Sequence, residues 1–322
     1  MVNEILNSNK LLTEIYFDLQ DYFEKKYPNV VVLIEIGSFF EVYEYDKKGK
    51  AKEIAELLNI QLTRKNKSIA TIDIKNPFMA GFPNHAIERY LQKLIDEDKY
   101  TIIIVKQKGL PPKVTRYISD IISPGVNFEY VKEYENYITS ILIEKTKDIY
   151  HIGYANVDIT TGKTYIYEAY SNNEDKTFAL DELFKLIQTY KSKEFILTLD
   201  KNVDCDEVVK YLELKNMNLI YSSSRIKINY QNELLKKVYN IQSLLTPIEA
   251  LNLEKLSLAT ESLSILLEFI IGHNYKIIQK ILTPQIIENN KYLYFGNNPI
   301  DQLDLNDVLK LIDKTTTPMG KD

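Results

Sequence analysis

The feature that most constrains the fold is a pair of strand-like segments near the N-terminus, at residues 30–36 and 39–45. The first is an almost uninterrupted apolar run, which indicates a strand buried on both faces. In the second segment, Phe39, Glu41 and Tyr43 share one face because successive side chains of a strand point to opposite sides. Since the first segment already supplies a buried strand, the face that carries Phe39 is left free for another role.

A large ring two positions from a carboxylate, as in Phe39 and Glu41, suits a wedge that enters a stack of bases and then reads one of them. On spacing alone, the commoner explanation is two aromatic residues, Phe39 and Phe40, packed in an edge strand. The spacing therefore leaves both interpretations open.

Strand and helix patterns alternate along the chain, which is typical of α/β domains. In the first 130 residues, amphipathic helical patterns at residues 10–27, 50–58 and 84–96 alternate with strands at residues 30–36, 39–45 and 100–105. A second α/β domain is predicted from strands at residues 137–144, 150–158, 164–169, 194–199 and 218–221. Its strand order suits a ribonuclease H-like arrangement.

Beyond about residue 225 every long pattern is helical. Thr246 and Glu249 form a capping box around Pro247, and we expect them to open a helix of about 25 residues that ends at Gly272. Thr317 and Pro318 announce another helix close to the last residue. We therefore expect the chain to be part of a longer protein.

Composition excludes several classes of protein. A hydrophobic share of 45% is ample for packed cores, and the net charge of -5 argues against a nonspecific nucleic-acid packager. No apolar run approaches a membrane span, and there is no signal peptide, so we expect a cytoplasmic, nucleoid-associated protein, with an organelle matrix as the alternative. One cysteine and three scattered histidines leave no zinc pattern, so no metal site is predicted.

Two local basic clusters stand out against the negative net charge. One is at Arg64, Lys65 and Lys67, and the other runs through residues 99–119, which hold Lys108 and Arg116. Such clusters can contact phosphates, although a solvated face is the more common explanation for either one alone.

Enzymatic interpretations find little support in the sequence. A ribonuclease H-like nuclease needs several carboxylates around two metal ions, and Asp158, at a strand end, has no evident partners. There is no GxxxxGK[ST] loop, and His85 has no nucleophile marked near it. We therefore expect no enzymatic activity and no catalytic residue in this chain.

Several segments, in the same order, resemble the MutS family of DNA mismatch-repair proteins. Residues 37–43 (GSFFEVY) resemble its GDFYELF segment, residues 55–65 its AxLLDIxLTxR and residues 77–86 its PMAGxPxHA. The remaining similarities are those of residues 123–125 to TPG, 155–162 to A-x-x-D-x-S-T-G and 311–320 to LLDxTxTPMG. The resemblance therefore covers the whole chain and is most specific in the first 125 residues.

The resemblance implies three parts. These are a mixed-sheet α/β mismatch-recognition domain at residues 1–128, a ribonuclease H-like connector domain at 129–228, and the beginning of a helical core or lever domain at 229–322. It also implies that the clamp and a P-loop ATPase domain lie beyond residue 322. ATP and Mg²⁺ would then be cofactors of the full-length homodimer, while this segment would need none.

The resemblance also implies a mechanism. Phe39 would enter the duplex from the minor groove at a mispair or small loop, and Glu41 would form a hydrogen bond to the displaced base. Arg64, Lys65, Lys108 and Arg116 would hold backbone phosphates.

The sequence departs from the family pattern at four positions. Ser38 replaces an Asp, Tyr43 replaces a Phe, Lys106 stands where Glu is usual, and Asp120 stands where Arg is common. The last change puts one phosphate contact in doubt.

Two other functions stay open. One is a protein-interaction module that docks repair partners through the connector domain without binding mismatches. The other is a single-stranded nucleic-acid binder that stacks bases on Phe39 and Tyr43. An exposed Phe39 beside Lys65 would favour contact with a DNA duplex, whereas a Phe39 ring buried in the core would favour the interaction module.

Overall fold

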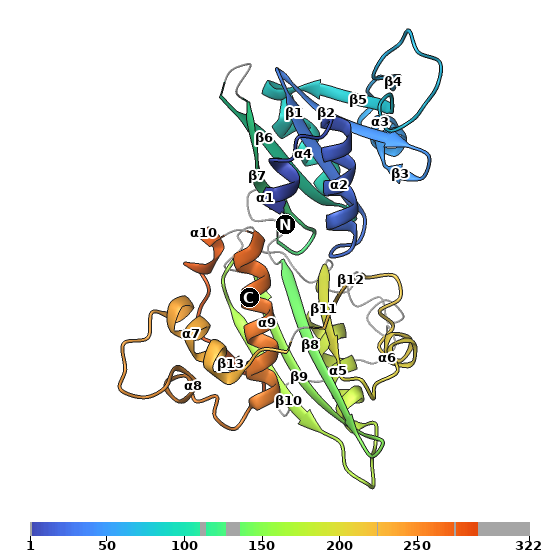
Figure 1. Cartoon of the computed structure of the whole chain (residues 1–322). Coiled ribbons are helices and arrows are strands. Elements are labelled where there is room, and N and C mark those ends of the chain that lie inside the picture. The colour runs from blue at the N-terminus through green and yellow to red at the C-terminus, as the bar shows by residue number, and fades with distance from the viewer. Residues whose placement is uncertain (1, 110–113, 127–135, 224, 274, 289–322) are drawn as a thin grey trace, which may run out of the picture.

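The computed structural model describes residues 2–109, 114–126, 136–223, 225–273 and 275–288. Figure 1 shows two α/β domains, the first at the top and the second at the bottom, joined near residues 123–126. The predicted α/β class is confirmed, with a mixed sheet in each domain.

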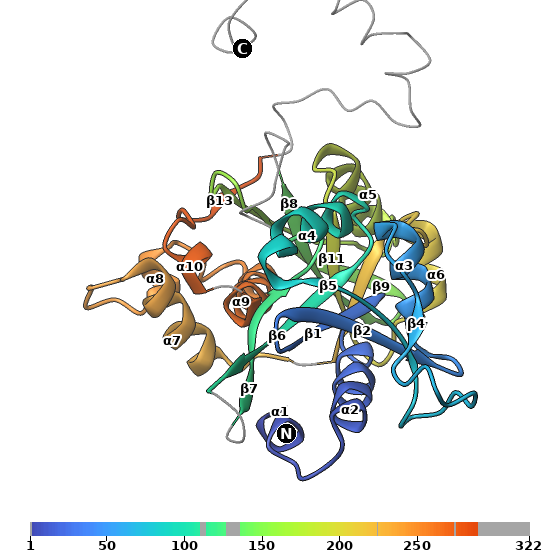
Figure 2. The ribbon, with the colours of Figure 1, turned by 90° about the horizontal axis from the view of Figure 1, so that it is seen from above.

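The first domain is built on a sheet in the order β4-β5-β2-β1-β6-β7, with β3 added to β2. Its strands are β1 (Val30–Ile36), β2 (Phe39–Tyr45), β3 (Lys48–Gly49), β4 (Thr63–Arg64), β5 (Phe78–Pro83), β6 (Thr101–Lys108) and β7 (Thr115–Ile122). Its helices are α1 (Val2–Leu6), α2 (Leu12–Glu24), α3 (Ala51–Leu58), the 3-10 turn η1 (Asn84–Ala86) and α4 (Ile87–Asp96). In Figure 2, α1 and α2 lie on one side of this sheet and α3 and α4 on the other.

Strand β1 is the centre of the first domain. It runs antiparallel to β2 and parallel to β6, and its first five residues are buried, as the apolar run predicts. On the α2 side, the rings of Tyr16 and Tyr43 meet edge to face with centroids 5.0 Å apart. On the α4 side, Phe82 stacks on Tyr90 at 4.5 Å. Helices on both faces therefore bury the middle of the sheet and leave its strand ends to form the surface.

The second domain has a sheet in the order β12-β11-β8-β9-β10-β13. Its strands are β8 (Tyr137–Thr146), β9 (Ile149–Asp158), β10 (Thr164–Tyr170), β11 (Glu194–Leu199), β12 (Asn218–Ser222) and β13 (Gln285–Ile286). Its helices are α5 (Phe178–Thr189), α6 (Cys205–Tyr211), α7 (Ile228–Tyr239), α8 (Pro247–Ala250), α9 (Ser257–His273) and α10 (Tyr275–Ile278). Three antiparallel strands followed by two parallel ones give the predicted ribonuclease H-like order.

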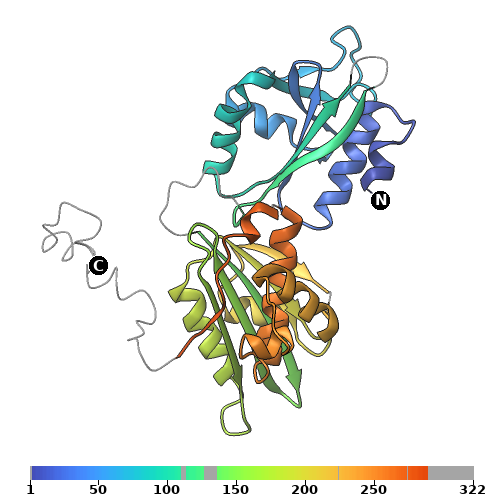
Figure 3. The same cartoon turned by 90° about the vertical axis from the view of Figure 1, so that its left-hand side faces the viewer.

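Helix α9 lies flat on one face of the second sheet, and α5 covers the opposite face (Figure 3). The close approach of α9 requires a glycine in β9, since a Cβ at Gly153 would lie 2.2 Å from the carbonyl oxygen of Leu258. Helices α7, α9 and α10 share one hydrophobic cluster with β8, β9 and β11. The domain boundary expected at residue 229 stays a prediction. The helix expected at Thr317 and Pro318 lies outside the described part of the chain.

The long helix expected from Thr246 to Gly272 is wrong in its extent. The capping box of Thr246 and Glu249 is present, but the helix that it opens, α8, ends at Ala250. Asn252 then takes a left-handed conformation with φ of 57°, and α9 starts only at Ser257. The apolar periodicity continues across this break because Leu253 is itself buried.

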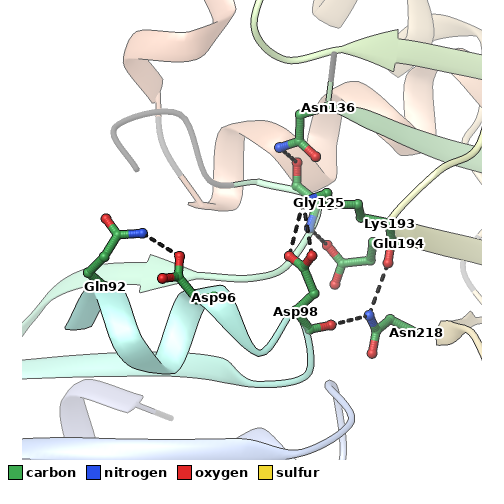
Figure 4. Close-up of polar contacts among 8 residues, drawn as sticks. All are labelled: Gln92, Asp96, Asp98, Gly125, Asn136, Lys193, Glu194 and Asn218. Atoms are coloured by element: carbon green, nitrogen blue, oxygen red, sulfur yellow. Dashed lines mark hydrogen bonds and ion pairs between the residues drawn. The ribbon is translucent and has the colours of Figure 1, made fainter. Parts of the chain in front are cut away.

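A buried carboxylate ties the two domains together. Glu194, the first residue of β11, accepts a hydrogen bond from the Ser123 hydroxyl at 2.6 Å. It also accepts one from the Gly125 backbone N–H at 3.1 Å (Figure 4). Gly125 has no room for a side chain, since a Cβ there would lie 2.7 Å from the Glu194 Cβ. Asn136 donates to the Gly125 carbonyl at 3.2 Å. The segment between the domains is therefore fixed on the second domain by direct hydrogen bonds.

Three further contacts connect the domains. Lys193 pairs with the Asp98 carboxylate at 3.0 Å, and the Asn218 amide donates to the Asp98 carbonyl at 2.9 Å (Figure 4). At the end of α2, Tyr27 meets His273 of α9 with ring centroids 5.3 Å apart. Polar and aromatic contacts on separate elements thus set how the first domain sits on the second.

The buried Glu194 gives a pH-dependent stability. Burial raises its pKa to about 7, whereas an unfolded glutamate titrates near about 4.3. Between these values the folded chain holds a proton that the unfolded chain has lost, so the free energy of unfolding falls as the pH rises through this range. We expect Glu194→Gln, which stays neutral, to remove this contribution. The unfolding free energy of the wild type relative to the variant should fall by roughly 2–4 kcal/mol between pH 4.5 and pH 8.

Urea denaturation at a series of pH values checks this expectation. Glu88→Gln, the same change at an exposed position of α4, is the matched control and should leave the pH dependence as it is. A constant difference between the wild type and Glu194→Gln across the range would contradict the buried-acid explanation.

Candidate nucleic-acid interface

Phe39 is the first residue of β2 and is 45% exposed. The strand pairs with β1 through Ile36 opposite Phe39, which leaves Gly37 and Ser38 as a two-residue turn. Gly37 has a positive φ of 60° and Ser38 does not, the pattern of a type II′ hairpin turn. The structure thus places an aromatic ring at the tip of a tight hairpin instead of in the core.

The turn that carries Phe39 is held by a side chain of β6 and by the backbone of the residue that follows β5. The Gln107 amide of β6 donates to the Gly37 carbonyl at 2.8 Å and accepts from the Gly37 N–H at 3.3 Å. The Asn84 N–H donates to the Ser38 carbonyl at 2.8 Å. Glu35 links Gln107 and Asn84, because its carboxylate accepts a hydrogen bond from the Gln107 backbone N–H at 2.9 Å and from the Asn84 side-chain amide at 3.4 Å. We call Glu35, Asn84 and Gln107 the turn clamp.

The turn clamp was not among the residues predicted for the site. Glu35 and Gln107 each follow an apolar run, in β1 and β6, and these strands are parallel neighbours. A polar residue at the same end of two buried neighbouring strands is a signal that could have pointed to them. The contribution of Asn84 could not have been found in this way, because it follows β5 on the far side of β2.

Glu41 lies half-buried on the same strand face as Phe39, as predicted. Its neighbour on β5 is Gly81. A Cβ at Gly81 would lie 2.9 Å from the Phe40 carbonyl oxygen and 3.3 Å from the Glu41 Cγ. The absence of a side chain at Gly81 therefore leaves room for the Glu41 carboxylate beside the exposed ring.

Tyr43 does not share the exposure expected for the Phe39 face. It is fully buried because α2 packs Tyr16 against its ring. Its hydroxyl donates a hydrogen bond to the Glu41 carboxylate. A base cannot stack on a buried ring, so the structure contradicts the single-stranded interpretation in which Phe39 and Tyr43 both serve as stacking platforms.

The structure brings two of the four predicted phosphate-binding residues close to this pair. The Lys65 ammonium lies 5.2 Å from the centre of the Tyr43 ring. Burial lowers the pKa of Lys65 and the charge of Arg116 adds to this effect, while Glu41 opposes it. Arg116 lies half-buried on β7, and its Nε is buried without a hydrogen-bond partner. Lys65 and Arg116 thus provide positive charge near the Glu41 carboxylate.

The other two predicted phosphate-binding residues have different surroundings. Lys108 ends β6 next to Gln107 and is exposed. Arg64 of β4 is turned into its own loop, where its guanidinium donates to the carbonyls of Lys67 at 3.1 Å and Ala70 at 3.2 Å. Lys108 is therefore free of the core at the strand end near Phe39, whereas Arg64 holds the loop between β4 and β5.

That loop is organised by one buried amide. Asn76, 3% exposed, donates to the carbonyls of Ile69 and Thr71 and accepts from the Asn66 N–H at 2.7 Å. The loop presents two large apolar side chains to solvent, Ile69 and Ile72. Sequence patterns gave no indication of this ordered loop, which follows Lys65 in the chain.

Asp158, the acid weighed for nuclease chemistry, is used by its own turn. It accepts hydrogen bonds from the backbone of Asn136 and Thr160 and from the hydroxyls of Thr160 and Thr161. Burial acts to raise the pKa of Asp158, but these hydrogen bonds outweigh it and hold the pKa below its ordinary value. In the described part of the chain, no group of three or more His, Cys, Asp or Glu side chains could hold a metal ion.

Helices long and apolar enough to cross a membrane do not occur among the residues described above.

The similarity of this chain to known proteins identifies its family. Residues 16–131, which begin in α2 and run past β7, match the family described as MutS domain I. The chain belongs to the MutS family. The family expected from the sequence is thereby confirmed, and the matched segment contains Phe39, Glu41 and the turn clamp.

Curated relatives of this MutS-family chain are similar to it over most of its length. A mutS homolog of Acanthamoeba polyphaga mimivirus is 32% identical over 367 residues, covering 98% of this chain and 32% of the homolog. The DNA mismatch repair protein MutS of Caldanaerobacter subterraneus is 29% identical, covering 92% of the chain and 33% of the relative. That of Porphyromonas gingivalis is 26% identical, covering 94% and 32%. The chain spans about a third of the length of the curated relatives it matches.

One solved structure, the human cytomegalovirus terminase nuclease domain, is similar with a TM-score of 0.23 and 11% identity. The match covers 57% of this chain and 80% of the terminase nuclease domain. A similarity this weak bears on neither fold nor function.

The turn clamp predicts a local effect of one substitution. Gln107→Leu keeps the size of the side chain but removes both hydrogen bonds to Gly37. Two hydrogen bonds at a partly exposed site contribute about 1–2 kcal/mol, so we expect a loss of that order in the free energy of unfolding. Amide hydrogen exchange should accelerate at residues 37–39 more than in the rest of the sheet.

The matched control is Gln92→Leu in α4, where the Gln92 amide donates to Asp96 within the same helix. This variant should leave exchange at residues 37–39 unchanged. Equal exchange at the turn in the wild type and Gln107→Leu would show that the clamp does not hold it.

Proposed function

We propose that the first domain of this chain recognises mispaired or unpaired bases in duplex DNA, as part of a mismatch-repair protein. The observation that carries this proposal is an exposed aromatic ring, Phe39, on a hairpin turn that the turn clamp fixes. A half-buried carboxylate, Glu41, lies on the same strand face. Membership of the MutS family and the names of the relatives, which are called DNA mismatch repair proteins, support the same function.

In this proposal Phe39 enters the minor groove and unstacks one base step. Unstacking costs a few kcal/mol, and the cost is lowest where pairing is already lost. A mismatched site also kinks more cheaply than a paired one. The protein would therefore select errors through deformability, without reading the surrounding sequence.

Glu41 supplies the polar half of the site. A carboxylate that faces DNA is repelled by phosphates, so its presence beside the wedge fits a hydrogen bond to the displaced base. The Lys65 ammonium lies 5.2 Å from the centre of the Tyr43 ring, and Arg116 is near enough to lower the pKa of Tyr43 against the effect of burial. Their positive charge offsets the repulsion and can attract the backbone.

The exposure of Phe39 supports this function over the protein-interaction alternative, for which a ring buried in the core was expected. For the full-length protein, we also propose binding of ATP and Mg²⁺, homodimer formation and a repair partner at the connector domain, in line with the resemblance described above.

The central test is Phe39→Ala in the full-length protein. We expect the preference for a mismatched over a paired duplex to be lost, because the wedge is gone. The melting temperature should change little, because the ring is largely outside the core. Fluorescence anisotropy with two duplexes that differ at one base measures the preference.

Phe178→Ala is the matched control, since Phe178 starts α5 in the second domain and is 40% exposed. It should leave the mismatch preference intact. An unchanged preference in Phe39→Ala would refute the wedge.

The predicted phosphate contacts are tested by salt dependence. Replacing a lysine that neutralises one phosphate lowers the slope of log K against log salt by about 0.9. We expect Lys65→Ala and Lys108→Ala each to reduce the slope by this amount for both mismatched and paired duplexes. Lys201→Ala, at an exposed position of the second domain, is the control, and a slope that Lys65→Ala and Lys108→Ala leave unchanged would remove these residues from the interface.

A further inference from the structure

Asp158 is a buried carboxylate that the proposed function does not use. It is 2% exposed and ends β9, at the start of a turn that leads to β10. We call residues 158–163 the Asp158 turn. Within it, the carboxylate accepts hydrogen bonds from Thr160 and from the Thr161 hydroxyl. Its Oδ1 also accepts from the N–H of Asn136, which precedes β8, so one carboxylate serves its own turn and a distant segment.

Asn136 connects the Asp158 turn to the linker, residues 123–126, which joins the first domain to the second. Its backbone N–H donates to the Asp158 carboxylate at 3.1 Å, and its carbonyl accepts from the Ile159 N–H at 2.9 Å. Its side-chain amide donates to the Gly125 carbonyl at 3.2 Å (Figure 4). Asn136 is 1% exposed, so these contacts lie in the protein interior. The Asp158 turn thus fixes the residue that holds the linker.

The opposite end of the Asp158 turn holds the strap, residues 280–287, which follows α10 and includes β13. The Gly162 N–H donates to the Asp158 carbonyl at 2.7 Å, and the Gly162 carbonyl accepts from the Leu282 N–H at 2.8 Å. Gly162 has a positive φ of 78°, and a Cβ there would lie 1.9 Å from the Lys280 carbonyl oxygen. The strap then pairs with β10 in parallel through β13. It is therefore in direct backbone contact with the turn.

The simplest explanation of these contacts is that Asp158 closes the hairpin of β9 and β10. Hydrogen bonds from Thr160 and Thr161 serve that purpose, but the bond from Asn136 does not, since Asn136 is no part of this hairpin. Burial acts to raise the pKa of Asp158, and hydrogen bonding holds it below the ordinary value, so the carboxylate is ionised at neutral pH. Hydrogen bonds to an ionised acceptor are stronger than those between neutral groups. Asp158 is therefore a stiff junction between the linker and the strap.

We propose that Asp158 is a positioning residue that couples the linker to the strap, so that a displacement of either segment is passed to the other through the Asp158 turn. Asn136 moves with the linker through its bond to Gly125, and it carries the Asp158 carboxylate with it. Gly162 lies against the Lys280 carbonyl without room for a methyl group, so the strap follows the turn.

This coupling goes beyond the proposed function, because it concerns how the two domains are connected and requires no DNA. The chain continues from the strap to residue 289. A movement of the first domain on the second is therefore passed to the part of the chain that follows the second domain.

A double-mutant cycle read by amide hydrogen exchange tests the coupling in the full-length protein without DNA. Ser123→Ala perturbs the linker directly, since it removes the hydroxyl that bonds to Glu194 and to the Val126 N–H. We expect this variant to accelerate exchange of the strap amides that are hydrogen-bonded to the second domain about 3- to 10-fold, as the loss of one hydrogen bond implies. In an Asp158→Asn background, the same change should alter strap exchange less than about twofold, because the junction is already weakened.

Single variants show whether the junction acts on both segments. Asp158→Asn alone should accelerate exchange in the linker and in the strap, because an amide side chain has one acceptor oxygen and no charge. Thr161→Val removes one hydrogen bond and keeps the carboxylate, so it should produce the same effect at both ends with a smaller size. Asp175→Asn is the matched control, since the Asp175 carboxylate accepts from the N–H groups of Thr177 and Phe178 in its own loop. It should leave exchange in both segments unchanged.

Three results would contradict the proposal. Strap exchange at the wild-type rate in Ser123→Ala would show that the linker and the strap are not coupled. An equal acceleration in the wild-type and Asp158→Asn backgrounds would show that the coupling bypasses Asp158. If Asp158→Asn accelerates exchange in β1 and β6 as much as in the strap and lowers the melting temperature, the carboxylate only supports the fold. Because no DNA is present, each of these results leaves the proposed recognition of mispairs by Phe39 untouched.

Discussion

The hydrogen bonds between the Gln107 amide and the Gly37 backbone are the interaction on which the candidate site depends. A two-residue turn at the end of a hairpin has little packing of its own, and its tip is exposed. Gln107 reaches it from β6 and Asn84 from the end of β5, while Glu35 of β1 links the two. Three strands thus converge on one turn, and the position of Phe39 follows from theirs.

The face of β2 that carries Phe39, Glu41 and Tyr43 has a buried part and an exposed part, and the position of α2 sets the boundary between them. Where Tyr16 of α2 lies on the sheet, Tyr43 is sealed in the core. Glu41 lies half-buried at the edge of this cover, and Phe39 lies outside it. The hydrogen bond from Tyr43 to Glu41 connects the core to the surface, so the packing of α2 influences the polar side chain on the same face as Phe39.

Local patterns predicted the elements well and the contacts poorly. The strands at residues 30–36 and 39–45 follow from apolar runs and alternation, which are properties of neighbouring residues. The alternation also put Phe39 and Glu41 on one face correctly. It could not show that Tyr43 is buried, because this depends on where α2 docks. Gln107 was missed for a similar reason, since it lies 70 positions from Gly37 in the chain.

Two failures have identifiable physical causes. The helix expected across residues 246–272 is interrupted because Asn252 adopts a left-handed backbone, although Leu253 keeps the apolar pattern intact. The apolar periodicity of a sequence indicates which residues are buried, but it does not indicate where the backbone leaves the helical conformation. Arg64 has the sequence context of a phosphate ligand, yet its guanidinium holds the carbonyls of its own loop. A charge pattern identifies a cation but not whether the chain itself already uses it.

The stiffness of the turn has a consequence for selectivity. A wedge discriminates between weak and strong base steps only if the wedge yields less than the DNA does. If Phe39 stood on a flexible turn, insertion at a paired step would displace the turn instead of deforming the DNA. The free energies of insertion at paired and mispaired steps would then differ little. In the proposed mechanism, hydrogen bonds from β6 and from the residue after β5 fix the turn, so that the deformation would be transferred to the duplex, where its cost depends on pairing. The turn clamp is therefore as necessary to the proposed selectivity as the ring, although no clamp residue needs to touch DNA.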